Sequence, residues 1–153
     1  MNQSASQYTI VVGVDGSEPS ENALRWAVDE AKHRRGRVVA VHAWQPPVPP
    51  ADVMPGPYPD YVELLGQVEE ASQKLVADVV AKVVGNDTTV PVEPTVVEGS
   101  PASVLIDAAE NADLVVVASR GHGGFVGLLL GSVSQKVVNH APCSVIVHRE
   151  AGP

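Results

Sequence analysis

The residues best suited to chemistry are glycines that follow an apolar run towards the C-terminal end of the chain. The run, Leu114–Ala118, is typical of a parallel strand covered on both faces. After it come Gly121, Gly123, Gly124, Gly127 and Gly131, and then Ser132 at a place where a helix would begin. Glycine lets backbone N–H groups approach a ligand because no Cβ intervenes. A helix start adds unpaired N–H groups and a positive dipole end. The pattern predicts a phosphate-binding loop.

Two known nucleotide motifs do not fit this loop. A dinucleotide fingerprint would place Gly-x-Gly-x-x-Gly directly after the first strand, but Asp15, Gly16 and Ser17 follow the first apolar run. A P-loop requires a lysine before its serine or threonine, and Gly131 precedes Ser132 here. The sequence therefore disfavours NAD binding and excludes a P-loop NTPase.

Alternating strands and helices must position the glycine loop. Apolar runs predict strands over Tyr8–Val14, Val38–Trp44, Val90–Glu98, Leu114–Ala118 and Cys143–His148. Apolar residues at helical spacing predict a helix between successive strands. Residues typical of helix starts and ends stand at the expected places: Ser17 or Ser20, Gly36, Gly85 and Pro142. This βαβαβαβαβ order is typical of an α/β fold with a parallel sheet and helices on both faces.

The order of the strands in the sheet follows from their composition. Tyr8–Val14 and Leu114–Ala118 are the most uniformly apolar and are expected at the centre, whereas two prolines place Val90–Glu98 at an edge. An open five-stranded sheet of order 3-2-1-4-5 satisfies both conditions and puts a crevice at the carboxyl ends of strands 1 and 4. Asp15 and the glycine loop would lie at those two ends. A strand-end aspartate can be only a turn residue, but its place at the crevice favours contact with a ligand.

Length and composition favour a single domain over residues 1–153, with a proline-rich surface loop at 45–59. The loop holds seven prolines, too many for a helix or a central strand. A net charge of −8 argues against nucleic acid as a partner, and no apolar run approaches the ~20 residues that cross a membrane. A single cysteine, Cys143, and a start without a secretory pattern indicate a cytoplasmic protein.

The spacing Ala118-x2-Gly121-x9-Gly131-Ser132 resembles the Gly-x2-Gly-x9-Gly-Ser/Thr motif of nucleotide-binding universal stress proteins. The first motif glycine is Ala118 here, which closes an apolar strand where extended backbone accepts alanine. The resemblance covers nearly the whole chain, with further matching segments at Val14–Ser17, Val41–Trp44, Gly99–Pro101 and Ala141–Val145. It implies an adenine nucleotide α-hydrolase-like fold that binds ATP.

The resemblance also implies which residues meet the ligand. Backbone N–H groups of the loop and the helix start, together with one hydroxyl, would bind the phosphates: Gly121, Gly124, Gly131, Ser132 and Val133. Mg²⁺ or Mn²⁺ would be held mainly by those phosphates, because the motif supplies no carboxylate cluster.

The nucleoside would lie against the ends of the strands. Asp15 and the backbone of Ala118 would stand by the ribose, and the backbone of Ala43 would recognise the adenine edge. Val14 and Ala102 would pack against the faces of the ring. In the loop, Arg120 and His122 either neutralise phosphate charge or stand in solvent, and the sequence favours neither.

No pair of residues stands out as a nucleophile and its base. His122 is the nearest candidate base, and a glycine-rich loop is a poor mount for it. The expected function is ATP binding with slow or no hydrolysis, in a stress-response or signalling protein. Two alternatives stay open: a dimer that acts through protein contacts without nucleotide, and binding of AMP or cyclic AMP instead. An enzyme of the wider α-hydrolase group is disfavoured.

The last strand predicts a partner. Ser144–His148 should be an outer strand, yet it has no proline and no inward charge. Bare apolar edges invite pairing with another chain, so a two-fold symmetric homodimer through this strand is expected. The family resemblance implies the same.

Overall fold

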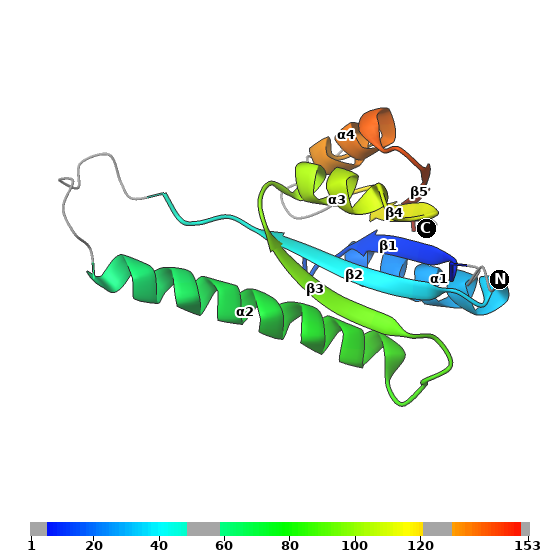
Figure 1. Ribbon diagram of the computed structural model, residues 1–153, viewed down its shortest axis with the longest axis horizontal. Coiled ribbons are helices and arrows are strands. Elements are labelled where there is room, and N and C mark those ends of the chain that lie inside the picture. Colours follow the sequence, from blue (N-terminus) through cyan, green and yellow to red (C-terminus); the bar gives the residue numbers. More distant parts are fainter. Residues whose placement is uncertain (1–5, 49–58, 121–129, 151–153) are drawn as a thin grey trace, which may run out of the picture.

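The structure, a computed structural model, describes residues 6–48, 59–120 and 130–150 (Figure 1). Strands and helices alternate along the chain in the predicted manner. In order they are β1 (Thr9–Gly13), α1 (Glu18–Arg34), β2 (Arg37–Trp44), α2 (Pro59–Val84), β3 (Val92–Glu98), α3 (Pro101–Ala109), β4 (Leu114–Ala118), α4 (Ser132–His140) and β5 (Ser144–His148). No helix of the described part of the chain is long and apolar enough to cross a membrane.

The five strands form one parallel sheet in the order β3-β2-β1-β4-β5. The predicted order is therefore confirmed. From β1 the chain adds β2 and then β3 on one side of the sheet, and it then returns to add β4 and β5 on the other side. The order in which strands are added therefore reverses between β1 and β4, and ligands bind at such a point in open sheets of this kind.

Proline 94 lies on the outer side of the edge strand β3. Val38 N donates to Pro91 O at 2.9 Å, and Gly99 N donates to Trp44 O at 2.9 Å. In a strand, alternate residues turn their backbone groups to the same neighbour, so the odd-numbered residues of β3 face β2 and Pro94 faces outward. Its missing N–H therefore costs no bond to β2 and leaves the outer edge without a donor there.

Each face of the sheet is covered by a pair of helices (Figure 1). On one face, α1 and α2 pack against alternate strand residues such as Ile10, Val12 and Val116, all fully buried. On the other, α3 and α4 pack against the intervening residues, such as Val115. The alternation explains why the central strands read as continuous apolar runs.

The end of α1 is built around a close approach of two backbones. The helix begins at Ser17, whose side chain accepts from Ser20 N, and ends with Arg35 in the left-handed region at φ 53°. Gly36 follows, and a Cβ on it would lie 2.5 Å from the carbonyl oxygen of Tyr8. The predicted helix-ending glycine is therefore needed for space rather than for a left-handed backbone.

The basic residues near the end of α1 are held by ion pairs rather than presented to a partner. Lys32 Nζ lies 2.8 Å from a carboxylate oxygen of Asp87, and Arg34 Nε lies 2.8 Å from Glu30. The hydrogen bond from Lys32 is the main cause that lowers the pKa of Asp87 below its usual range. Cations in the last turn of a helix also complement its dipole.

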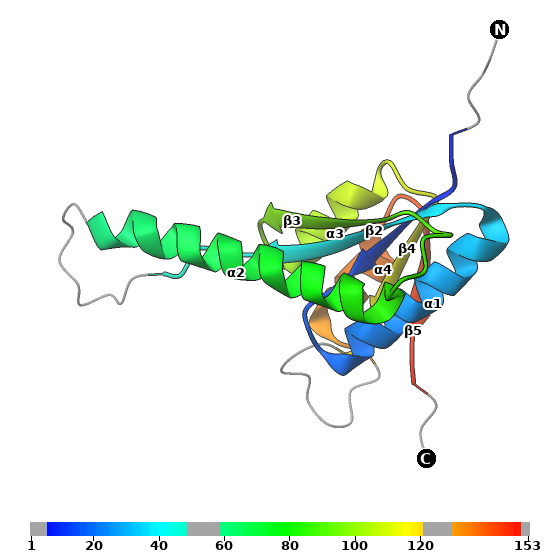
Figure 2. The same cartoon turned by 90° about the horizontal axis from the view of Figure 1, so that it is seen from below.

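Helix α2 is longer than the sheet that it covers. It has 26 residues, or about 39 Å, whereas the 8 residues of β2 span about 26 Å. Its N-terminal half projects beyond the sheet beside residues 45–48, as both views show (Figures 1 and 2). Pro59 is the first helical residue, a position that tolerates proline, so the loop predicted over 45–59 ends one residue earlier. Residues 49–58 lie outside the described part of the chain.

Candidate functional site

The end of β1 is fixed by bonds from β2. Val14 N donates to Val41 O at 2.8 Å, and the ring of His42 contacts Val14 O through Nδ1 at 2.7 Å. A carbonyl oxygen only accepts, so Nδ1 carries the proton. The backbone contact makes His42 a structural residue at this place. His42 also orients the residue that precedes Asp15.

Asp15 lies in a tight turn between β1 and α1. Its Oδ1 accepts from Ser17 N at 2.9 Å and from the Ser17 hydroxyl, and its N–H donates to Ser20 Oγ at 3.3 Å. Gly16 between them has φ +82°, a conformation that glycine adopts without strain. The local turn bond considered in the sequence is therefore present. The same bond holds the carboxylate of Asp15 at the end of β1, where the sequence predicts the ligand site.

The chain segments on either side of the glycine loop are joined by hydrogen bonds. Ser119 N donates to His148 O at 2.9 Å, and Ser119 O accepts from Gly131 N at 2.7 Å. The buried Ser134 Oγ donates to Ser119 O at 3.2 Å and to Gly131 O at 2.9 Å. These bonds form a neck that fixes the start of α4 against the end of β4. The predicted site residues Gly121, His122 and Gly124 lie outside the described residues.

The start of α4 leaves N–H groups for a ligand, among them those of Ser132 and Val133. Gly131 is the N-cap, with φ −72° and ψ 168°, and its own N–H is used by Ser119. The N–H groups of Ser132 and Val133 belong to the first turn, and none of the described residues accepts from them. Ser132 is exposed, and Val133 packs partly against the α3–α4 core. The helix start can therefore bind an anion through these N–H groups and the Ser132 hydroxyl.

The residues predicted to surround the adenine lie on different faces of the sheet. The half-buried Ala43 packs with the core under α3 and α4, and Ala102 is buried in the first turn of α3. Val14 packs instead in the core under α1 and α2. Its backbone lies at the site, but its side chain is on the opposite face from Ala43.

The two central strands thus bring part of the predicted set together. Asp15 follows β1, and Ala118 closes β4, its neighbour in the sheet, with the half-buried Arg120 two residues further on. Among the described residues no group of three or more His, Cys, Asp or Glu side chains could hold a metal ion.

Cys143 does not have the features of a nucleophile. It is half-buried, and burial is the main cause that raises the pKa of its thiol, with the charge of Asp113 adding to it. A raised pKa keeps the sulfur protonated at neutral pH, when it is a weak nucleophile.

Comparison with known proteins adds an independent observation. The model of the universal stress protein family matches residues 8–149. The chain belongs to this family. Universal stress protein Rv2623 of Mycobacterium tuberculosis is 38% identical over 145 residues, which cover 95% of this chain and 46% of that protein. The chain therefore spans about half the length of this curated relative.

Solved universal stress proteins have the same fold. UspA from Lactobacillus plantarum superposes with a TM-score of 0.74 at 24% identity, over 94% of this chain and 98% of that one. A universal stress protein solved in complex with cyclic AMP gives a TM-score of 0.67 at 24% identity, over 96% of this chain and 100% of that one.

Three residues that hold the candidate site together are not in the set predicted to contact a ligand. Ser119 and Ser134 hold the neck, and His42 holds the end of β1. Ser134 carried a signal in the sequence, because it stands three residues before Val137 and so on the apolar face of a short helix. In the structure it is only 2% exposed. Such a side chain needs internal hydrogen bonds.

Proposed function

We propose that this chain binds an adenine nucleotide, with ATP the favoured ligand, where β1 and β4 end. It would act as a stress-response or signalling binder in the cytoplasm, with slow or no hydrolysis. The observation that carries the proposal is the neck between Ser119 and Gly131, which fixes the first N–H groups of α4 at the end of β4, the neighbour of the strand that Asp15 follows.

Other members of the family support an adenine ligand. Proteins with this fold have been solved in complex with cyclic AMP, with AMP in Arabidopsis thaliana and with dAMP in Archaeoglobus fulgidus. These ligands share adenine, a ribose-type sugar and one phosphate. ATP extends the same group by two phosphates, which the motif at Gly131 and Ser132 suits.

The proposed roles follow the positions of the residues. Ser132 and Val133 bind phosphate through N–H groups, Gly131 gives the ligand room, and Gly121, Gly124, Arg120 and His122 are further candidates for contact with the phosphates. Asp15 and the backbone of Ala118 contact the ribose. The backbones of Ala43 and Val14 and the side chain of Ala102 border the adenine. The phosphates carry Mg²⁺ or Mn²⁺.

Calorimetry of the purified chain with ATP, AMP and cyclic AMP tests the proposal. ATP with Mg²⁺ should bind more tightly than AMP, because two further phosphates reach the start of α4. Steady-state phosphate release should stay near the background rate, since the carboxylate that we place at the site, Asp15, is assigned to the ribose and not to the terminal phosphate. Heat from none of the three nucleotides would favour the alternative of a binder without nucleotide, and rapid phosphate release would favour an enzyme.

A homodimer through β5 is the second part of the proposal. Ser119 N donates to His148 O, so the even-numbered residues of β5 face β4 and the backbone groups of Val145 and Val147 face outward. The apolar residues of β5 are only half-buried in the single chain. A second copy would pair with these outward groups about a two-fold axis.

Replacing Val147 by proline should abolish this dimer, because it removes an outward N–H and leaves the bonds to β4 in place. Sedimentation at micromolar concentration should give twice the chain mass of 16.0 kDa for the wild type and the single mass for Val147→Pro. Val138→Lys, at an exposed apolar position on α4, is the matched control and should stay dimeric. A monomeric wild type would rule the dimer out.

A further inference from the structure

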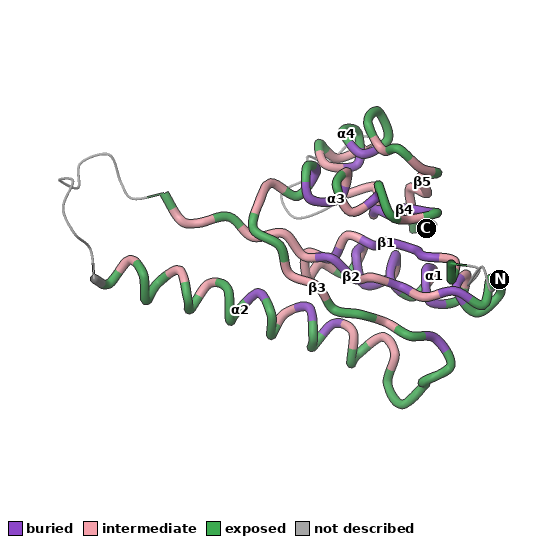
Figure 3. The backbone as a smooth tube through the Cα atoms, viewed as in Figure 1, coloured by how far each residue is buried: buried purple, intermediate pink, exposed green. Residues whose placement is uncertain are grey.

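The projecting half of α2 carries an apolar face that the described chain covers only in part. No residue from 60 to 71 is buried, and burial begins only at Ser72 (Figure 3). The stripe that buries Val76 and Val79 nevertheless continues outward at helical spacing through Val68, Leu65 and Tyr61. Beside it, Val62 is 72% exposed and Leu64 is 42% exposed.

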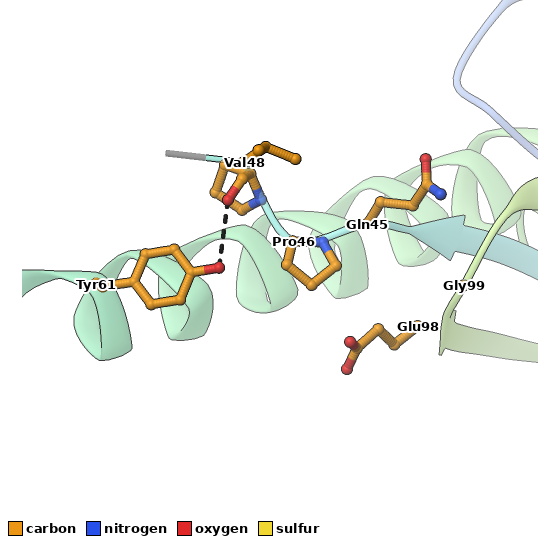
Figure 4. Close-up of a pocket in the computed structure, with 7 residues that line it drawn as sticks. Gln45, Pro46, Val48, Tyr61, Glu98 and Gly99 are labelled. Carbon is orange, nitrogen blue, oxygen red and sulfur yellow. Dashed lines mark hydrogen bonds between the residues drawn. The ribbon is translucent and has the colours of Figure 1, made fainter. Parts of the chain in front are cut away.

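An open pocket joins this face to the ends of β2 and β3. It has a volume of about 600 Å³ and is lined by residues 45–48, Tyr61, Glu98 and Gly99 (Figure 4). The Tyr61 hydroxyl donates to Pro47 O at 3.3 Å, which ties the outer helix to the segment after β2. Val48 at the pocket is 89% exposed. We call the pocket, the half-buried Tyr61 and the exposed apolar residues Val48, Val62 and Leu64 the overhang surface.

The overhang surface is bordered by negative charge alone. Asp60, Glu63, Glu69 and Glu70 lie on the outer part of α2, and Glu98 lines the pocket. No Lys or Arg occurs in the sequence between Gln45 and Gln73. None of these five carboxylates forms an ion pair with a cation of the described chain.

We propose that the overhang surface docks a basic amphipathic helix of another protein. Exposed apolar patches with a polar rim mark such contacts, and an amphipathic helix buries its apolar face in a groove of this kind. Its apolar residues would cover Val48, Tyr61, Val62 and Leu64. Its Lys and Arg residues would meet the surrounding carboxylates, which also steer a cationic partner towards the surface.

Charge argues against a second copy of this chain as the occupant. Two overhang surfaces facing each other would bring like charges together. The cations that the chain could offer are largely engaged, since Lys32, Arg34, Arg37, Lys74 and Lys82 each pair with a carboxylate of their own chain. The proposal is independent of the nucleotide site at β1 and β4.

A designed helix tests the proposal directly. The probe is a fluorescein-labelled peptide of about 18 residues, five helical turns, with leucine at i, i+3, i+4 and i+7 and lysine elsewhere. One control peptide has the same composition in scrambled order, and another has glutamate in place of lysine. By fluorescence anisotropy, the amphipathic lysine peptide should bind the wild type about tenfold more tightly than either control, and added salt should weaken its binding.

The double variant Val62→Ser, Leu64→Ser should lose about tenfold in affinity for the lysine peptide. Both residues are exposed, so the far-ultraviolet circular dichroism should not change. Val138→Ser, at an apolar position 45% exposed on α4, is the matched control and should bind the peptide like the wild type. ATP affinity should be the same in all three proteins.

Three results would overturn the proposal. Equal affinity for the amphipathic and the scrambled lysine peptides would show that binding is only a general attraction between opposite charges. Unchanged peptide affinity in the double variant would show that the overhang surface is not the site. A shift of the sedimenting mass in the double variant alone would assign the surface to a second copy. Failure of the wild type to bind ATP would leave the docking proposal intact.

Discussion

Gly131→Val should bind ATP at least tenfold more weakly than the wild type, a loss of about 1.4 kcal/mol in binding free energy. Gly131 stands between the end of β4 and the first N–H groups of α4. A Cβ there would lie 3.5 Å from Ser119 O and 3.7 Å from Arg120 Cα. The two further methyl groups of valine would have to enter the space that we assign to the phosphates.

Gly131→Ala separates this obstruction from a change in the fold. The contacts of its Cβ are ordinary ones, and φ of −72° suits any residue. Alanine and valine are both less favourable than glycine at an N-cap, so each should weaken the start of α4 to a similar, small extent. If the valine variant binds ATP more weakly than the alanine variant by calorimetry, the difference measures how far the valine methyl groups obstruct the proposed phosphate site. Equal ATP affinity in all three proteins would contradict the assignment of the phosphate site.

Gly36→Ala should lower the free energy of unfolding by about 2–3 kcal/mol. The new Cβ would stand 2.5 Å from Tyr8 O. That oxygen cannot move away without loss, because it accepts from Arg37 N at 2.8 Å. Gly36 itself donates to Ala31 O at 2.8 Å and closes α1, so the strain would be shared by the end of the helix and the start of β1.

Thermal unfolding measures the effect of Gly36→Ala. For a chain of this length each kcal/mol corresponds to about 2–4 °C in Tm, so a decrease of about 4–12 °C is expected. Gly66→Ala is the matched control. Gly66 lies in the interior of α2 with no heavy atom within 4 Å of its added Cβ, and alanine there should raise stability by about 0.5–1 kcal/mol. A Gly36→Ala protein as stable as the wild type would show that the two backbones can separate at little cost.

The sheet was predictable because its strand order depends on local composition. Prolines at 91 and 94 confine β3 to an edge, and the apolar residues of β1 and β4 require cover on both faces. The strand limits were less certain: the strand predicted from Val90 begins at Val92, after a proline that cannot donate. The last predicted strand likewise begins at Ser144 rather than Cys143.

The part of the site that could be predicted from the sequence is the part in which glycines mark the backbone turns. Spacing placed Gly131 and Ser132 at a helix start, and both stand there. Spacing does not reveal which donors are already used, so the bond from Gly131 N to Ser119 O appeared only in three dimensions. Which face of the sheet the side chain of Val14 lies on depends on the pleat of β1, and the spacing of the motif carries no information about that pleat.

The projection of α2 could not be foreseen from its apolar periodicity. Tyr61, Leu65 and Val68 have the same spacing as Val76 and Val79, although only the latter two are buried. The difference in burial arises because β2 is shorter than α2, so the sheet lies against only the C-terminal part of the helix. An amphipathic pattern states that a face needs cover, but not what supplies it.

The outward position of Pro94 has a consequence for the growth of assemblies. A sheet with two open margins can add copies at both and extend into a filament, as in cross-β fibrils. Here one margin lacks a donor where an incoming strand would need it, and the other carries the groups of Val145 and Val147. If copies pair through β5 as we propose, Pro94 disfavours a second pairing at the β3 edge, so we expect the assembly to stop at the dimer rather than extend into a filament.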